Sequence, residues 1–226
     1  MIKMDKMIVY EDNVLLVVHK PAGIATETAR VGQADLVSEL KNYRKRKGED
    51  TYVGVVHRLD QPVEGLLVFA KDGGTARALS DGLQRGTLTK RYAVLAAGVP
   101  QTSEGILTDH LLRDGRTNLS KVVPKETKGA KKAVLHWQIV RHDDEISLLE
   151  IELRTGRHHQ IRAQLANAGF PLLGDTKYGS GSSRELSDRY AVNSTALLAY
   201  ALRLTHPGTG REMEFLLDID KFTKIF

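Results

Sequence analysis

The chain has 226 residues, of which 41% are hydrophobic and 27% charged, with a formal net charge of +5 and no Cys; this composition is typical of a globular protein. The missing Cys excludes disulfides, thiolate metal sites and a Cys nucleophile, and no apolar run approaches the ~20 residues of a membrane span. Because the N-terminus also lacks the apolar core of a signal peptide, we expect a cytoplasmic protein.

Hydrophobic runs and helical spacings predict the secondary structure in chain order. The expected elements are a strand at 14–18, a helix from 35 to about 43 ending at Gly48, a strand at 65–70, a helix at 75–83 stopped by Gly86, strands at 92–97, 133–141 and 146–153, a helix at 157–168, a flexible loop at 179–183, and strands at 197–205 and 212–218. Strands follow one another more often than they alternate with helices. We therefore expect an α/β (α+β) class with a mixed, largely antiparallel β-sheet and a few packed helices.

The basic charge is unevenly distributed along the chain. Residues 113–132 contain seven basic and two acidic residues, an excess equal to the net charge of the whole chain, and a second basic cluster covers residues 42–48. Two basic patches on an otherwise balanced protein favour a polyanionic partner, most simply nucleic acid; a solvated loop and a solvated helix end are the alternative. Since the chain has no repeat and no long linker, we expect a single catalytic domain over residues 1–226 with a basic insertion at about 100–132.

The segment His57-Arg58-Leu59-Asp60 lies in a turn between two hydrophobic runs that are predicted to be strands. Asp60 is therefore expected to be held by rigid neighbours and to face a cleft, as a catalytic carboxylate should. The alternative is an Asp that only accepts hydrogen bonds from backbone N–H groups of its own turn.

A second group of polar residues, 154–162, is predicted to run from a strand through a Gly turn into a helix. Ile161, Leu165 and Ala168 form the apolar stripe of this helix. Arg162 lies at the edge of the stripe, so its stem can be buried while its guanidinium reaches a cleft. Residues 157–160 are expected in the first helical turn, where unpaired backbone N–H groups favour an anion.

Asp60 and Arg162 are the natural pair, because a semi-buried Arg needs a carboxylate and a cleft Asp needs a cation to stay ionised. Tyr92, which enters a strand directly after Lys90 and Arg91, can supply a flat ring and a phenol at the same site. The alternatives are an ordinary structural salt bridge for Arg162 and strand packing for Tyr92.

A metal site is a further possibility, because His57, Asp60, His158 and His159 are all possible ligands. Adjacent histidines on a helix point about 100° apart, and no His-x-x-x-His pattern or metallohydrolase carboxylate cluster is present. We therefore expect no catalytic metal. The chain also lacks a Gly-rich phosphate loop and a Gly-x-Ser-x-Gly elbow, which disfavours nucleotide hydrolysis and Ser-hydrolase chemistry.

Taken together, the motifs resemble those of the RluA-type pseudouridine synthases, in the same order and over nearly the whole chain. The matching blocks are residues 8–12, 17–23, 57–60 with 65–71, 90–92, 155–162 and 171–179. The resemblance implies the pseudouridine synthase catalytic fold and the isomerisation of uridine to pseudouridine in RNA, without cofactor or metal. Ribosomal RNA or transfer RNA is the expected partner, with the target uridine in a looped or single-stranded region.

The resemblance also implies roles for individual residues. Asp60 would be the essential carboxylate, Arg162 would hold Asp60 ionised and oriented, and Tyr92 would stack on the detached uracil. Arg58 would enter the RNA stack as the target uridine leaves it. Further RNA contacts are expected from Lys90, Arg157, His158, Lys128, Lys131 and Lys132.

Two positions depart from the family pattern. Val63-Glu64 stands where Thr-Ser is usual, and His158 stands where Thr or Ser is common. Because the chain begins almost directly at the catalytic domain, we expect it to lack the small basic RNA-binding domain that many relatives carry upstream. The alternatives to a synthase are an RNA-binding or RNA-chaperone protein on the same fold, with the activity lost or secondary, and a metal-dependent hydrolase that uses the His pair.

Overall fold

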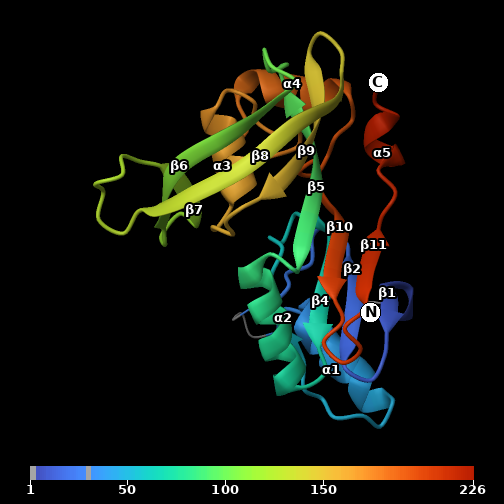
Figure 1. Cartoon of the computed structure of the whole chain (residues 1–226). Helices are drawn as coiled ribbons and strands as arrows, with labels where there is room; N and C mark the ends of the chain where they lie inside the picture. Colours follow the sequence, from blue (N-terminus) through green and yellow to red (C-terminus); the bar gives the residue numbers. More distant parts are fainter. Residues whose placement is uncertain (1–3, 29–31) are drawn as a thin grey trace. The chain divides into compact units, whose positions relative to one another are not determined.

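The computed structural model describes residues 4–28 and 32–226. These residues divide into two compact units (Figure 1). Unit 1 contains residues up to Lys90 together with Ala199–Leu217, and unit 2 contains Arg91–Leu198 with Asp218–Phe226. The single catalytic domain expected from the sequence stays a prediction.

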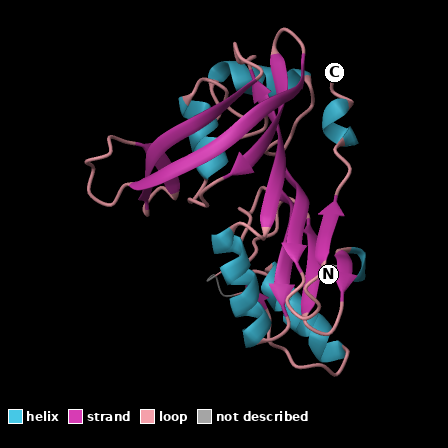
Figure 2. Ribbon diagram, viewed as in Figure 1, coloured by secondary structure: helices cyan, strands magenta, loops and turns pink. Residues whose placement is uncertain are grey.

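Unit 1 is a mostly antiparallel sheet with two helices, which Figure 2 shows in magenta and cyan. Its strand order is β1-β2-β4-β10, with β3 paired to β4 and β11 paired to β10. Leu79 of α2 packs against β2, β4 and β10 through Val17, Val68 and Leu202, all buried. The elements are η1 (Met4–Lys6), β1 (Ile8–Glu11), β2 (Leu15–Lys20), α1 (Leu36–Arg46), β3 (Gly54–Val55), β4 (Glu64–Ala70), α2 (Gly73–Arg85), β10 (Leu197–Thr205) and β11 (Glu212–Leu216).

Local sequence accounts for the helix ends in unit 1. The Asp35 side chain accepts a hydrogen bond from the Ser38 N–H (2.7 Å) and begins α1, as an Asp at the N-cap does in many helices. Gly86, with a φ of +78°, ends α2 in the left-handed conformation that favours glycine. Both helices were predicted from the spacing of their apolar residues and from the glycine that follows each of them, and both are confirmed.

Gly65 allows β4 and β10 to lie close together. Its φ is +143°, and a Cβ atom at this position would lie 2.5 Å from the Ala199 Cβ. Any larger residue would therefore push the two strands apart. The Gly after Glu64 is thus needed by the sheet at the edge of the Asp60 loop.

Unit 2 is an antiparallel sheet with three helices. Its strand order is β5-β9-β8-β6-β7, and α3 packs on one face through Ala163, which contacts Leu111 and Ala133. The elements are β5 (Thr89–Ala97), β6 (Glu104–Asp114), β7 (Leu119–Val122), β8 (Lys131–His142), β9 (Ile146–Leu153), α3 (Gln160–Asn167), α4 (Gly181–Arg189) and α5 (Asp220–Thr223).

The predicted fold class, a mixed and largely antiparallel sheet with a few helices, is confirmed. Residues 104–114 and 119–122, expected only as part of a basic insertion, form β6 and β7. The flexible loop predicted at 179–183 is wrong, because Ser180 begins α4 with a capping box. The Ser180 Oγ accepts from the Ser183 N–H (3.1 Å), and the Ser183 Oγ accepts from the Ser180 N–H (2.8 Å).

Candidate active site

Asp60 lies in unit 1 on the connection between β3 and β4, and its neighbours are fixed through the backbone. Leu59 is buried; its N–H donates to the Thr26 Oγ1 (3.3 Å), and this hydroxyl donates back to the Leu59 carbonyl (3.0 Å). The Val63 N–H donates to the Asp60 carbonyl (3.0 Å) and closes the turn. Asp60 itself is half-buried, and these backbone bonds hold its loop in place. That Asp60 is a catalytic carboxylate facing a cleft stays a prediction.

Lys20, at the end of β2, has a fully buried side chain next to this loop. Its Nζ donates to three carbonyl oxygens, of Pro21 (3.0 Å), Ile24 (2.7 Å) and Gln61 (3.2 Å). Burial lowers the pKa of Lys20 to about 8, and the charge of Asp60 acts in the opposite direction. Since the attraction is mutual, Lys20 favours the ionised form of Asp60.

The sequence prediction missed Lys20, although a signal was present. Lys20 follows the apolar run Val17-Val18 with only His19 between them and directly precedes Pro21. In a strand it shares the face of Val18, so its side chain is directed toward apolar neighbours. Buried lysines need hydrogen-bond acceptors or a negative charge, and the adjoining turn supplies the acceptors.

His57 and Arg58 point to different surroundings. His57 is buried, its Nε2 accepts a hydrogen bond from the Val68 N–H (3.4 Å), and its Nδ1 has no partner among the described residues. Burial, with a smaller effect of the Lys90 charge, lowers the pKa of His57 well below its usual value. Arg58 is exposed, with a distant ion pair to Glu27 (3.9 Å). His57 is therefore a neutral side chain of the interior, whereas Arg58 is accessible.

Lys90 and Glu64 are the remaining polar residues of interest in unit 1. Lys90 is half-buried, and burial lowers its pKa to about 8. Glu64, one of the two departures from the family pattern, lies 2.9 Å from the Nε2 of His19 on the neighbouring strand β2. Its charge, like that of Asp60, raises the pKa of Lys20.

Arg162 lies in unit 2 on α3 and is buried, with 2% of its surface exposed. Its Nε donates to the Oδ2 of Asp175 (2.6 Å) and its Nη2 to the Oδ1 of Asp175 (2.7 Å), a bidentate pair. Burial raises the pKa of Asp175, but the hydrogen bonds and charge of Arg162 outweigh this effect and hold that pKa below its usual value. The sequence correctly required a carboxylate for Arg162 but overlooked Asp175; the additional pairing with Asp60, a residue of unit 1, stays a prediction.

Tyr92 lies on β5, with 4% of its surface exposed, opposite Ile151 of β9.

The predicted helix start at residue 157 is wrong, because α3 begins at Gln160. The Gln160 Oε1 accepts from the Arg157 N–H (2.9 Å) and from the Thr155 Oγ1 (2.8 Å), which holds the preceding residues as a loop. Only the last of residues 157–160 is therefore helical.

His158 and His159 do not diverge as two residues of a helix would. Their rings stack with centroids 3.8 Å apart and an interplanar angle of 23°, because His159 has a φ of +53°. Such a left-handed conformation is uncommon for a residue other than Gly, but less so for His than for most. The Arg157 Nε donates to the Lys132 carbonyl (2.9 Å) and joins this loop to β8.

The three lysines expected to contact RNA are exposed but do not share one face. Lys131 and Lys132 are consecutive on β8, so their side chains point to opposite faces of the sheet. Lys131 is paired with Leu111, whose side chain packs toward α3. Lys132 therefore lies on the other face, and Lys128 lies in the loop before β8.

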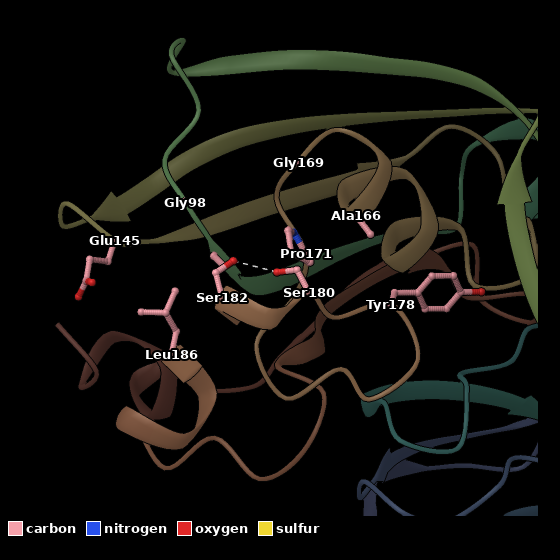
Figure 3. A pocket seen from close by; sticks show the side chains of 10 residues that line it. Gly98, Glu145, Ala166, Gly169, Pro171, Tyr178, Ser180, Ser182 and Leu186 are labelled. Carbon is pink, nitrogen blue, oxygen red and sulfur yellow. Dashed lines mark hydrogen bonds between the residues drawn. The ribbon is translucent and has the colours of Figure 1, made fainter. Parts of the chain in front are cut away.

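A pocket of about 530 Å³ in unit 2 contains none of the predicted site residues. Figure 3 shows that the Tyr178 ring, which lines its edge, points away from Glu145 and Leu186 on the opposite side. In residues 4–28 and 32–226, no three His, Asp or Glu side chains are grouped as metal ligands. No helix in the same residues is long and apolar enough to cross a membrane.

Comparisons with known proteins identify close similarity to one family. Residues 14–167 match the family model described as RNA pseudouridylate synthase. The chain is 37% identical over 206 residues to the uncharacterized RNA pseudouridine synthase YhcT of Bacillus subtilis, covering 89% of this chain and 65% of the relative. It is 34% identical over 217 residues to the ribosomal large subunit pseudouridine synthase D of Vibrio cholerae, covering 92% and 65%.

A further relative, the uncharacterized RNA pseudouridine synthase YlyB of Bacillus subtilis, is 33% identical over 219 residues, covering 94% of this chain and 68% of the relative. The chain thus spans about 65% of the length of the first two relatives. Among solved structures, human RNA pseudouridylate synthase domain containing 4 superposes with a TM-score of 0.77 at 23% identity, covering 98% of this chain and 92% of that chain. This likeness shows that the fold is shared.

Proposed function

Because the chain belongs to the RNA pseudouridylate synthase family, we propose that it isomerises uridine in RNA to pseudouridine. The observation that carries the proposal is the setting of Asp60. Its carboxylate is half-buried, its loop is bonded through Leu59 and Val63, and a buried ammonium, that of Lys20, acts on it electrostatically. A rigid, ionised carboxylate beside a cation is the group that this reaction needs.

The proposed reaction leaves the composition of the RNA unchanged. The bond between the ribose C1′ and the uracil N1 breaks, the uracil turns in place, and C1′ bonds to C5. The hydrogen on C5 leaves as a proton and N1 gains a proton, so no electrons are exchanged with a cofactor. Attack on the ribose, attack on the base and removal of a ribose proton all require Asp60 to be ionised, and Lys20 supports each of them.

Unit 2 supplies the other two residues of the proposal. A guanidinium presents five N–H donors in a fixed fork, of which Arg162 uses Nε and one hydrogen of Nη2 for Asp175. We propose that Arg162, besides its pair with Asp175, also holds Asp60 in the RNA complex. Tyr92 is proposed to stack on the detached uracil and to assist the removal of the proton from C5.

The proposed substrate is an RNA whose target uridine lies in a loop or a single strand, because the base must leave its helix at a cost of roughly a few kcal/mol. The exposed side chain of Arg58 can fill the place that the base leaves. The basic insertion at about 100–132 is called the arm below. Phosphate contacts from Lys90, Arg157, His158 and the lysines of this arm would offset part of that cost. Ribosomal RNA is the first substrate to test, with transfer RNA second, because one relative is named for the large ribosomal subunit.

The test is release of tritium from ribosomal and transfer RNA transcripts made with 5-tritiated uridine. The wild type is expected to release tritium from one of them, and Asp60→Ala to lower the rate by about four orders of magnitude or more, since it removes the reacting group. Asp60→Ala should still bind the same RNA. If the wild type releases no tritium from any RNA, the RNA-binding alternative is favoured instead. Loss of activity with a chelator would point to the metal-dependent alternative.

A further inference from the structure

Tyr178 belongs to a turn that is built around Asp175. The Asp175 Oδ1 accepts hydrogen bonds from the backbone N–H groups of Lys177 (2.9 Å) and Tyr178 (3.1 Å). The turn places the Tyr178 ring against Arg162, whose guanidinium carbon lies 5.0 Å from the ring centroid. A guanidinium over a tyrosine ring is a favourable arrangement. One turn therefore gives Arg162 both its carboxylate and its ring.

The Tyr178 hydroxyl joins this turn to β7 and to the start of α3. Its oxygen accepts a hydrogen bond from the Ser120 N–H (2.7 Å) and lies 2.8 Å from the His159 Nδ1. Burial, and then the Arg162 charge, lowers the pKa of His159 to about 3, so the imidazole is neutral and its Nδ1 accepts the phenolic hydrogen. Ser120 and His159 are both buried, and loss of the hydroxyl would leave each with one polar group lacking this partner.

Ser120 makes a second connection between β7 and the loop before α3. Its Oγ donates to the His158 carbonyl (2.7 Å) and lies 2.9 Å from the His158 Nδ1. The strand β7 has four residues and lies at the end of the strand order of unit 2, and these side-chain bonds add to its backbone pairing with β6. Lys121, the next residue, is exposed on the opposite face of the strand.

We propose that Tyr178 is a positioning residue through which β7 sets the place of the Arg162 guanidinium. This inference rests on the proposed function, in which Arg162 acts on Asp60. RNA held by Lys121 fixes β7, and the Tyr178 hydroxyl transmits that position to the ring that lies against Arg162. Binding of RNA to the arm is in this way coupled to the geometry of the reacting site.

The first test compares Tyr178→Phe, which removes only the hydroxyl, with Tyr190→Phe as the matched control. The Tyr190 hydroxyl also makes a side-chain hydrogen bond in unit 2, to the Asp143 carboxylate (3.3 Å), and Asp143 belongs to the turn between β8 and β9 rather than to β7 or α3. For Tyr178→Phe we expect kcat for tritium release to fall about tenfold while KM for RNA changes less than about threefold. Tyr190→Phe is expected to match the wild type in both constants.

A role in stability alone is distinguished by the pH profile of kcat. If the guanidinium of Arg162 moves, Asp60 loses part of its cationic support, so the acid limb of the profile moves to higher pH in Tyr178→Phe. A purely structural defect would lower the melting temperature and leave the acid limb in place. The proposal would be overturned if Tyr178→Phe had the same kcat as the wild type, or if its kcat were reduced while the acid limb of its pH profile stayed in place.

A second measurement does not depend on activity. The Arg162 Nε–H, bonded to Asp175, is followed in ¹⁵N-labelled protein by its exchange with solvent. Tyr178→Phe is expected to speed this exchange at least about fivefold, because local opening becomes easier, whereas Tyr190→Phe leaves it unchanged. If the wild type releases no tritium, the proposed function fails and this exchange alone decides: an unchanged rate in Tyr178→Phe overturns the positioning role.

Discussion

The loop of Asp60 and the helix of Arg162 are held in place by different kinds of hydrogen bond. Around Asp60, in unit 1, the bonds run to main-chain atoms: Lys20 donates to three carbonyls, and Thr26 bonds both backbone groups of Leu59. Around Arg162, in unit 2, the buried cation is held by another side chain, because its Nε and Nη2 both donate to the carboxylate of Asp175. A main-chain scaffold depends on one or two residues, whereas a side-chain network depends on the identity of every member.

The two regions also differ in the kind of cation that they contain. Unit 1 places an ammonium with a pKa of about 8 beside its carboxylate, and this cation is lost in mildly alkaline solution. Unit 2 uses a guanidinium, which stays protonated at every pH of interest, next to a histidine whose pKa of about 3 keeps it neutral. The two regions should therefore respond differently to substitution and to pH.

The largest expected effect follows from breaking the side-chain network. Asp175→Asn leaves the buried charge of Arg162 without its counter-charge and is expected to lower the free energy of unfolding by ~3–5 kcal/mol. Urea denaturation measures the change. As a control, Glu212→Gln removes the partner of Arg203 in an exposed ion pair and should cost at most ~1 kcal/mol.

A double variant sharpens this result. Asp175→Leu combined with Arg162→Met removes both charges and is expected to recover most of the lost stability, since a buried ion pair is readily replaced by apolar residues. It should remain inactive, because Arg162 is absent. Equal stability of Asp175→Asn and the wild type would show that the pair contributes little to the fold.

A smaller effect is expected in the pH dependence of activity. Since the pKa of Lys20 is lowered to about 8, its ammonium is present below that pH and is lost above it, and Asp60 then keeps only the proposed contact with Arg162. We expect kcat/KM for tritium release to fall above pH 8. Lys90 has a similar pKa, so Lys90→Arg is the control, and the fall should persist in it. A profile that stays flat to pH 9.5 in the wild type would contradict the role of Lys20.

The same lysine gives a stability prediction of defined sign. The pKa of Lys20 is about 8 in the folded protein and 10.5 in its unperturbed state, so between these values the unfolded chain binds more protons. The contribution of Lys20 to stability therefore rises with pH across this window. Lys20→Met, compared with the exposed Lys41→Met, should lose this rise when unfolding is measured from pH 7.5 to 10.

The smallest expected effect separates the two faces of the arm. Lys131 shares the face of α3 and Arg162, whereas Lys132 lies on the other face. If RNA approaches from the side of Arg162, Lys131→Gln should lower the salt dependence of RNA binding by roughly one unit of log–log slope, and Lys132→Gln by much less. The two variants have the same charge, so equal slopes would contradict a one-sided contact.

Most strands and helices were predictable because their signals are local. The apolar run that ends at Val18, the Asp at the start of α1 and the Gly at the end of α2 act within a few residues of themselves. The strands β6 and β7 were missed because neither has an apolar core of its own. Their half-exposed residues become regular only by pairing with β8 and with each other.

The start of α3 was predicted too early for a related reason. The Gln160 side chain takes hydrogen bonds from Thr155 and Arg157 and donates to the Val134 carbonyl (3.1 Å). That last partner lies on another strand, so helical spacing alone could not reveal it. The capping box of α4, by contrast, is a local signal that was present in Ser180 and Ser183.

The sequence by itself determined the chemical nature of the candidate site: an Asp on a turn, an Arg at a helix edge, a Tyr entering a strand, and their match to one family. Tertiary structure decided the partners. Arg162 takes Asp175, 13 residues further along the chain, and Lys20 reaches the carbonyl of Gln61, 41 residues away. A buried charge requires a partner, and this requirement can be read from one residue. Which residue becomes the partner depends on which segments the fold brings within about 3 Å of the buried charge, and the local sequence does not contain this information.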